Sequence, residues 1–351
     1  MTHAQIRPPT HMNLHAAAPS SIRTVAGFSD YVRIARLDHM TKHVFILPGI
    51  ALALLLRGSA VSEGPMAIAM NIVLGFLAAV GVAAANYVIN EWLDREFDRY
   101  HPEKSQRAAV QRQMHGGFIL LEYAVLLVAG MALALAVNDT TFVACGLLAI
   151  SGVTYNVKPI RTKDRPYLDV LSESLNNPIR LLIGWAMVDA TSLPPVSLFF
   201  AFWFGGAFLM NSKRLAEYRD IVASDGRETL GLYRRSFLHY TEAHLSVANL
   251  VYALLCSFFL AIFLIKYRIE YIVLFPCIVV LFAVYYALAL TPDSVARKPE
   301  KLYRAKPVIA AAILTSVLFV AATLIDIPVL ETLASQHFIE TGGQHFLTSA
   351  P

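Results

Sequence analysis

The sequence predicts an all-α polytopic membrane protein, on the evidence of its composition, its apolar segments and its distribution of charge. The chain has 351 residues, of which 56% are hydrophobic and only 15% are charged. Its mean hydropathy is +0.54. Soluble domains contain fewer apolar and more charged residues than this. Most of the chain is therefore expected to lie in a lipid bilayer.

Nine apolar segments come close to the roughly 20 residues that a helix needs to cross the hydrocarbon core. Arg57 interrupts the first of them, and the fourth is short and contains Gly146 and Gly152. We predict nine transmembrane helices, which cover residues 43–61, 66–89, 117–137, 140–156, 167–188, 195–212, 243–265, 270–290 and 307–330.

The distribution of Lys and Arg supports this assignment, because cytoplasmic loops carry an excess of basic residues. With nine crossings, 25 of the 29 basic residues fall on the side of the N-terminus. Only Arg57, Lys266 and Arg268 lie on the other side, and Arg180 lies within a segment. We predict a multi-pass protein of the cytoplasmic (inner) membrane with a cytoplasmic N-terminus. The net charge of +4 arises in the orienting loops and does not indicate nucleic-acid binding.

One transmembrane domain, residues 31–332, is expected between two loose ends. No Gly/Ser-rich or Pro-rich linker divides it. Residues 1–30 are predicted to form a flexible cytoplasmic arm, because they are rich in Pro, Ser, His and Ala in their first part and lack the build of a signal peptide. Residues 333–351 are predicted to form a tail on the non-cytoplasmic side.

An acidic helical face follows the second apolar segment. Asn90, Asp94 and Asp98 are spaced i, i+4 and i+8, so they lie on one side of a helix at the membrane surface. Like charges at this spacing repel, and neither aspartate has a cation four residues further on. Mg²⁺ suits such oxygen ligands, and the phosphates of a substrate usually complete its shell. The alternative is an ordinary charged helix end, in which Glu91 pairs with Arg95.

A phosphorylated substrate also needs positive partners, which the same side of the membrane supplies. Lys acts as a point charge and Arg as a fork, although each of these residues could instead serve only to orient the chain. Lys213 and Glu217 share a helix face and could form a plain surface ion pair. Tyr155 could belong to the aromatic belt at the interface. The candidate cations are Lys42, Lys104, Arg107, Lys158, Arg161, Lys213 and Arg214.

Residues 90–99, followed by His101, Pro102, Lys104 and Arg107, resemble the first Asp-rich motif of the UbiA superfamily of intramembrane prenyltransferases. The resemblance extends over about residues 31–324, although this first motif is its specific part. It implies a bundle of nine transmembrane helices with a central cavity, a lateral opening for a lipid chain and a polar cap towards the cytoplasm.

The aromatic prenyltransferases of this family usually carry a second Asp-rich motif after the sixth helix. This chain instead has Lys-Arg-Leu-Ala-Glu at residues 213–217. Together with Tyr155, Lys158 and Lys42, this element is similar to the decaprenyl-phosphate phosphoribosyltransferase branch. The branch implies transfer of phosphoribose from 5-phosphoribosyl 1-diphosphate to a polyprenyl phosphate, with release of diphosphate. Glu91 and Ala108 depart from the family pattern, which usually has Asp and Pro at these positions.

The resemblance assigns a role to each candidate. Asn90, Asp94 and Asp98 hold Mg²⁺, and Asp94, Asp98 and Lys213 form the catalytic set. The predicted substrate-binding residues are Lys42, Glu91, Lys104, Arg107, Tyr155, Lys158, Arg161, Arg214 and Glu217. The expected partners are a polyprenyl phosphate, phosphoribosyl diphosphate or another diphosphate substrate, and membrane lipids, and the sequence leaves an oligomer open.

Three other functions compete with this one. The first is a UbiA-type prenyltransferase that moves a polyprenyl group from its diphosphate to an aromatic or other small acceptor. A transporter or lipid-binding protein would place its ionisable residues near the membrane midplane, whereas here they lie at one surface. A CDP-alcohol phosphotransferase would need an Asp-Gly-x-x-Ala-Arg opening, which the chain lacks.

Overall fold

The structure is a computed structural model that describes residues 24–61, 63–100, 104–291, 294 and 305–334. Every regular element in this part of the chain is a helix. Most of the predicted arm and most of the predicted tail lie outside the described residues. The first helix, α1 (Phe28–Ile34), begins just before the predicted start of the transmembrane domain.

Six helical stretches are long and apolar enough to cross a membrane, which confirms the all-helical membrane class. They correspond to six of the nine predicted segments. The stretches are Lys42–Ala60, α3 (Pro65–Asp98), α5 (Gly116–Val137), α11 (Glu242–Tyr267), Ile269–Ala289 and α13 (Lys306–Leu324).

The other three predicted segments are also helical, but they are more polar or interrupted. They form α6 (Asp139–Asn156), the pair α7 (Leu168–Ser174) and α8 (Asn176–Ala186), and α9 (Val196–Asp225). A single helix was expected over 167–188, but the chain breaks at Leu175, three residues before Pro178. Proline lacks the N–H that a continuous helix needs in its interior. As the polar sequence predicted, α9 continues beyond its apolar run and ends before Gly226, where φ is +82°.

The remaining elements are η1 (Leu37–Ile46), α2 (Leu47–Arg57), η2 (Gly58–Ala60), η3 (Lys104–Gln106), α4 (Ala108–Gln111), η4 (Thr162–Asp164), η5 (Arg227–Thr229), α10 (Leu230–Tyr233), η6 (Arg235–His239), η7 (Ile269–Leu274), α12 (Phe275–Ala289) and α14 (Pro328–Ala334). They are short connections, except that part of η1 with α2 and η2, and η7 with α12, make up the first and fifth of the six apolar stretches.

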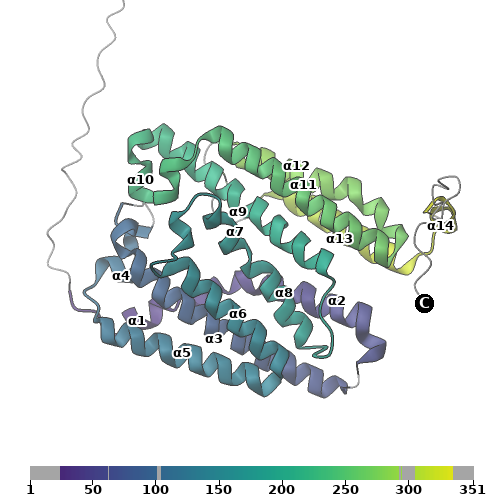
Figure 1. Cartoon of the computed structure of the whole chain (residues 1–351), viewed down its shortest axis with the longest axis horizontal. Coiled ribbons are helices and arrows are strands. Elements are labelled where there is room, and N and C mark those ends of the chain that lie inside the picture. The colour runs from purple at the N-terminus through teal and green to yellow at the C-terminus, as the bar shows by residue number, and fades with distance from the viewer. Residues whose placement is uncertain (1–23, 62, 101–103, 292–293, 295–304, 335–351) are drawn as a thin grey trace, which may run out of the picture.

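The long helices lie side by side (Figure 1). Helix α3 packs on α5 and α6, α9 packs on α11, α2 packs on α8, and α12 packs on α13. Helices α1, α4 and α10 lie at one end of the molecule, and α14 lies at the other (Figure 1). The polar ends of α3, α6 and α9 therefore meet near α4 and α10.

Two glycines allow α8 to lie directly against the η1–α2 segment. A Cβ atom at Gly184 would stand 2.1 Å from the carbonyl oxygen of Ile46, and one at Gly49 would stand 2.1 Å from that of Leu181. Real Cβ atoms do not approach oxygen this closely, so any side chain here would push the helices apart. Small residues commonly permit such backbone contacts between membrane helices.

Replacing Gly184 with Ala is expected to destabilise the protein by about 1–3 kcal/mol, because the added methyl group forces a backbone shift. The change in thermal unfolding in detergent measures this effect. Gly146→Ala is the matched control, since its Cβ atom would meet nothing closer than Met131 Cε at 3.7 Å. Equal melting temperatures for the two variants would show that α8 does not lie against η1 in this way.

Candidate functional site

The predicted acidic face lies at the C-terminal end of α3. Because α3 continues unbroken to Asp98, Asn90, Asp94 and Asp98 share one side of it, as their spacing predicted. Asn90 Nδ2 donates to Asp94 Oδ2 at 3.1 Å and to Asn156 Oδ1 at 2.6 Å. Asn156 is the last residue of α6, so this contact joins the polar ends of two helices.

Two cations from the loop after α6 surround Asp94. Arg161 Nη2 donates to Asp94 Oδ1 at 3.0 Å, and Lys163 Nζ contacts the same oxygen. Arg161 Nη1 also donates to the Asn156 carbonyl oxygen at 2.7 Å, and Lys163 Nζ to Asn156 Oδ1 at 2.8 Å. Arg161 has φ +28°, a conformation that L-residues rarely adopt. The turn at Arg161 directs both side chains back towards α3, and their hydrogen bonds offset its strain.

Asp98 has a partner of its own. Arg107 Nη1 lies 2.5 Å from Asp98 Oδ2. Glu91 is buried, and its carboxylate accepts from the backbone N–H of Ala109 at 3.5 Å, a weak contact. The structure thus places Glu91 beside the start of α4, where it interacts with Arg107 and with Asp98.

These ion pairs correct one step of the sequence argument. The spacing of Asp94 and Asp98 predicts a metal between them, because neither residue has a cation at i+4. The cations instead come from other elements, as Arg161, Lys163 and Arg107. Charge repulsion alone therefore does not require a metal, and the case for one depends on the ligand chemistry of the site.

A second cluster of charges lies on α7 and the polar half of α9. Arg214, whose side chain is 3% exposed, donates from Nη2 to Glu173 Oε2 at 2.9 Å and from Nη1 to Glu217 Oε2 at 3.0 Å. Lys213 Nζ lies 3.9 Å from Glu217 Oε1, which is the i, i+4 ion pair that the sequence offered as the alternative reading. Tyr155 donates its hydroxyl to Glu173 Oε2 at 2.8 Å.

Asp169 anchors this cluster from within α7. Its side chain is fully buried and accepts hydrogen bonds from Ser236 Oγ at 2.9 Å and from Tyr240 Oη at 2.7 Å. Arg214 and Arg234 each approach Asp169 Oδ2 to 3.7 Å. Asp169 thereby fixes η6 and holds two guanidinium groups at the same place.

The two clusters face each other across a short gap. Lys163 Nζ lies 5.6 Å from the centre of the Tyr155 ring, over its face. Burial lowers the pKa of Lys104 to about 8, against the opposing influence of Glu217 and Asp98, which belong to different clusters. Burial alone would raise the pKa of Glu217, but Arg214 and Lys213 outweigh it and hold that pKa well below its usual range. One site therefore includes the ends of α3, α6, α7 and α9.

Two predicted substrate-binding lysines lie outside these ion pairs. Lys42 is exposed and stands over the Tyr87 ring, with Nζ 5.4 Å from the ring centre. Electrostatic interactions with Glu173 and Lys213 place it near the second cluster. Lys158 is exposed in the loop after α6. Lys163, from the same loop, pairs with Asp94.

Five residues of the site were missed by the sequence reasoning. They are Asn156, Lys163, Asp169, Glu173 and Arg234. Lys163 and Arg234 had been counted only as orienting charges. Asp169 and Glu173 carried a usable signal, since carboxylates within an apolar segment are costly in lipid and usually face a polar interior.

The ligand chemistry of the α3 end fits Mg²⁺. Among the residues that the structure describes, no three His, Cys, Asp or Glu side chains lie close enough together to hold a metal ion. Mg²⁺ does not need three, because one or two carboxylates usually hold it together with substrate phosphates. Asp94 and Asp98 provide these carboxylates. Asn90 directs its nitrogen at Asp94, so its amide would have to turn over to offer oxygen to a cation.

Comparison with known proteins agrees with this architecture. A structure of a UbiA homolog from Archaeoglobus fulgidus bound to GPP and Mg²⁺ has a TM-score of 0.61 and 20% identity, and the match covers 84% of this chain and 100% of that chain. The same homolog bound to DMAPP and Mg²⁺ gives a TM-score of 0.60 and 20% identity over the same shares. A digeranylgeranylglyceryl phosphate synthase gives 0.55 and 15%, covering 84% and 97%. At these identities, the similarity shows the fold.

No curated protein sequence matches the chain. The model of the UbiA prenyltransferase family, in contrast, matches residues 46–310, which is most of the sequence and includes both charged clusters. The match confirms the superfamily that the motif at residues 90–99 had suggested. The chain therefore belongs to the UbiA prenyltransferase family.

Proposed function

We propose that this transferase moves a phosphoribosyl group from 5-phosphoribosyl 1-diphosphate to a polyprenyl phosphate and releases diphosphate. The observation that supports this choice is the charge of α9. Where a second acidic motif would hold a second metal, α9 presents Lys213 and Arg214 next to Arg234. A donor with a diphosphate and a separate 5-phosphate needs more cations than a prenyl diphosphate does.

In this proposal Asp94 and Asp98, with Asn90 after its amide turns over, hold Mg²⁺, as expected for a family in which a solved homolog binds Mg²⁺. The ion would neutralise the diphosphate and so make it a better leaving group. Arg161, Lys163, Lys104 and Arg107 surround the same carboxylates and can turn from them to phosphate oxygens.

Charged residues of α9 position the sugar donor for the reaction. Lys213 and Arg214 bind the donor's phosphates, and Glu217 either orients them or accepts a hydrogen bond from a ribose hydroxyl. An oxygen of the lipid phosphate forms the new bond to C1 of the ribose, while the bond from C1 to the diphosphate oxygen breaks and the diphosphate leaves with the electron pair. A phosphate monoester is already anionic near pH 7. No general base is required.

The membrane arrangement follows the same proposal. Helix α6, the α7–α8 pair and α9 complete a set of nine crossings with the six apolar stretches. In this proposal the N-terminus and both charged clusters face the cytoplasm of an inner membrane. The short elements near α4 and α10, which lie at one end of the bundle (Figure 1), would form the polar cap over the site.

Prenyl transfer is the second candidate, because the solved homolog binds the prenyl diphosphates GPP and DMAPP. Both reactions use the same acidic face, and they differ in which substrate carries the diphosphate. The polar half of α9 favours the sugar donor, since it begins with Lys213 and Arg214 where a second acidic motif would begin.

The purified protein, given Mg²⁺, phosphoribosyl diphosphate labelled in the ribose and a polyprenyl phosphate, is expected to produce a labelled lipid. Extraction into organic solvent and mass spectrometry would identify it. If the label stays in the aqueous phase while a prenyl diphosphate is consumed with a small acceptor, the prenyltransferase reading is correct and the sugar donor is wrong.

Asp94→Asn and Asp98→Asn are expected to lower turnover at least a hundredfold, because each removes a carboxylate from the proposed Mg²⁺ site. Turnover measured across a Mg²⁺ titration, together with thermal unfolding, separates loss of the site from loss of the fold. Asp139→Asn is the matched control, since Asp139 is exposed at the far end of α6. Full activity in both test variants would remove the metal assignment.

Lys213→Ala is expected to raise KM for the soluble donor about tenfold or more, with a much smaller effect on KM for the lipid. Arg219→Ala serves as its control, because Arg219 is on the same helix in an exposed ion pair with Glu242 at 3.5 Å. A loss of stability with equal effects on both substrates would instead support a structural ion pair between Lys213 and Glu217.

A further inference from the structure

Arg180 is a buried cation that neither charged cluster uses. It lies in α8, is 6% exposed, and forms no ion pair with any residue in the described part of the chain. Its Nη1 makes one long contact, 3.4 Å, with the Asn176 carbonyl oxygen in the preceding turn, and its Nε is buried without a hydrogen-bond partner. An uncompensated buried charge is strongly destabilising, so this arrangement needs a reason.

The surroundings of Arg180 are polar and only partly satisfied. Asn176 Oδ1 is buried without a hydrogen-bond partner one turn earlier on the same helix, and His43 Nδ1 is buried without one on η1. Electrostatic interactions with His43, Tyr87 and Glu173 place these groups around the guanidinium. A buried guanidinium group with an unpaired Nε–H suits a bound anion that is absent from the protein chain. Asn176 Oδ1 is an acceptor, so that amide would have to turn over to donate to the anion.

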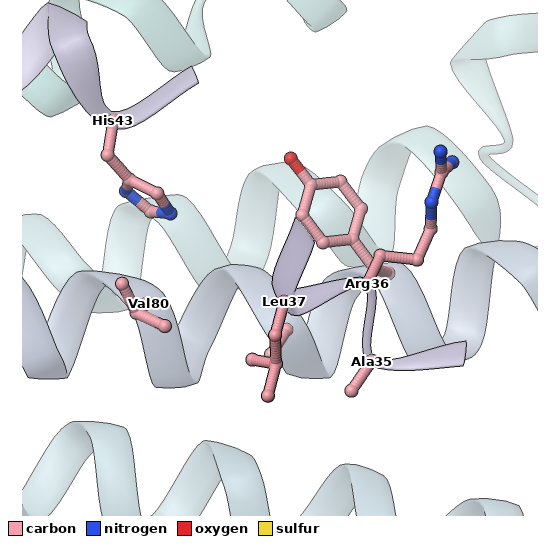
Figure 2. A pocket seen from close by; sticks show the side chains of 7 residues that line it. Ala35, Arg36, Leu37, His43 and Val80 are labelled. Atoms are coloured by element: carbon pink, nitrogen blue, oxygen red, sulfur yellow. The ribbon is translucent and has the colours of Figure 1, made fainter. Parts of the chain in front are cut away.

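The small cavity beside His43 is not the place for that anion. Figure 2 shows His43 above the α3 turn that carries Val80, with Arg36 and Leu37 along the same cavity. The cavity volume is about 10 Å³, which is room for roughly one water molecule. A phosphate group needs more room than this, so it would contact Arg180 outside this cavity.

Arg180 lies deeper in the bundle than the two clusters. Arg180 follows Glu173 by seven residues, which is roughly 10 Å along helical backbone. Asp189 lies further along the chain, at the far end of the bundle, where it pairs with Arg57 at 3.0 Å. A soluble donor enters from the polar end, where Lys213 and Arg214 lie. A lipid acceptor must keep its isoprenoid chain in hydrocarbon, because exposing apolar CH₂ groups to water is unfavourable. Its phosphate therefore approaches from the membrane side.

We propose that Arg180, flanked by His43 and Asn176, binds the phosphate monoester of the polyprenyl acceptor, below the position of the soluble donor. This inference rests on the proposed function for the identity of the acceptor. The rival source of the same chemistry is the 5-phosphate of the sugar donor, which would reach Arg180 from the polar end.

Binding measurements on the full chain in detergent test the site without turnover. Farnesyl phosphate, farnesol and ribose 5-phosphate are titrated into the wild type and Arg180→Gln in the presence of EDTA, so that no Mg²⁺ site contributes. The wild type is expected to bind farnesyl phosphate more tightly than farnesol. Arg180→Gln is expected to lose ten- to a hundredfold in affinity for farnesyl phosphate and to bind farnesol unchanged, since a charge-assisted hydrogen bond is lost.

Two further variants keep the result interpretable. Arg57→Gln removes the same charge from the far end of the bundle, where Asp189 is its partner, and should bind farnesyl phosphate as the wild type does. Arg180→Lys keeps the charge but loses the fork, and should bind farnesyl phosphate with intermediate affinity. If Arg180→Gln does not fold, the affinity of Arg180→Lys for farnesyl phosphate tests the proposal in its place.

Wild-type affinity for farnesyl phosphate in the Arg180 variants would overturn the proposal, as would an equal loss for farnesol. A loss confined to ribose 5-phosphate would also overturn it and assign Arg180 to the donor. The transfer assay is independent of these results. If farnesyl phosphate binding depends on Arg180 but no phosphoribose is transferred, the lipid phosphate site stands and the donor assignment fails.

Discussion

The ion pairs of Arg214 set the geometry of the polar end of this bundle. Each buried ion costs several kcal/mol unless partners compensate it. Arg214 compensates Glu173 and Glu217 directly, at 2.9 and 3.0 Å, and lies 3.7 Å from Asp169. Because Asp169 and Glu173 lie on α7 and Arg214 lies on α9, this guanidinium group joins the two helices at their polar end. It does so in addition to the hydrogen bond from Trp203 Nε1 to the Leu171 carbonyl oxygen.

The interruption between α7 and α8 lies next to the ion pairs of Arg214. Pro178 cannot donate the hydrogen bond that a continuous helix over 167–188 would need there. The helix is interrupted at Leu175, between α8 and the turn of α7 whose two acids meet Arg214. Pro178 thus influences the site from a position that touches none of its charges.

The sequence was sufficient for the features that depend on local periodicity. Apolar segments predicted the helices, and the i, i+4, i+8 spacing put Asn90, Asp94 and Asp98 on one face, because both depend only on helical geometry. The partners of those residues could not be predicted in this way. Asp94 is joined to Lys163 across the end of another helix, and the positive φ at Arg161 that brings Lys163 there is favoured by tertiary contacts and not by residue type.

The charge balance of the site limits what it can bind. Asp94 and Asp98 already have three cationic partners without any ligand, so a divalent ion alone would bring more positive charge to a place that is neutralised. A diphosphate and a metal that arrive together avoid this cost, since Arg161, Lys163 and Arg107 can exchange a carboxylate oxygen for a phosphate oxygen. The cations therefore favour joint binding of metal and substrate, in which the phosphates form part of the metal's shell. A second acidic motif on α9 would repel the third phosphate of the proposed sugar donor. Lys213 and Arg214 instead provide two further cations for that phosphate.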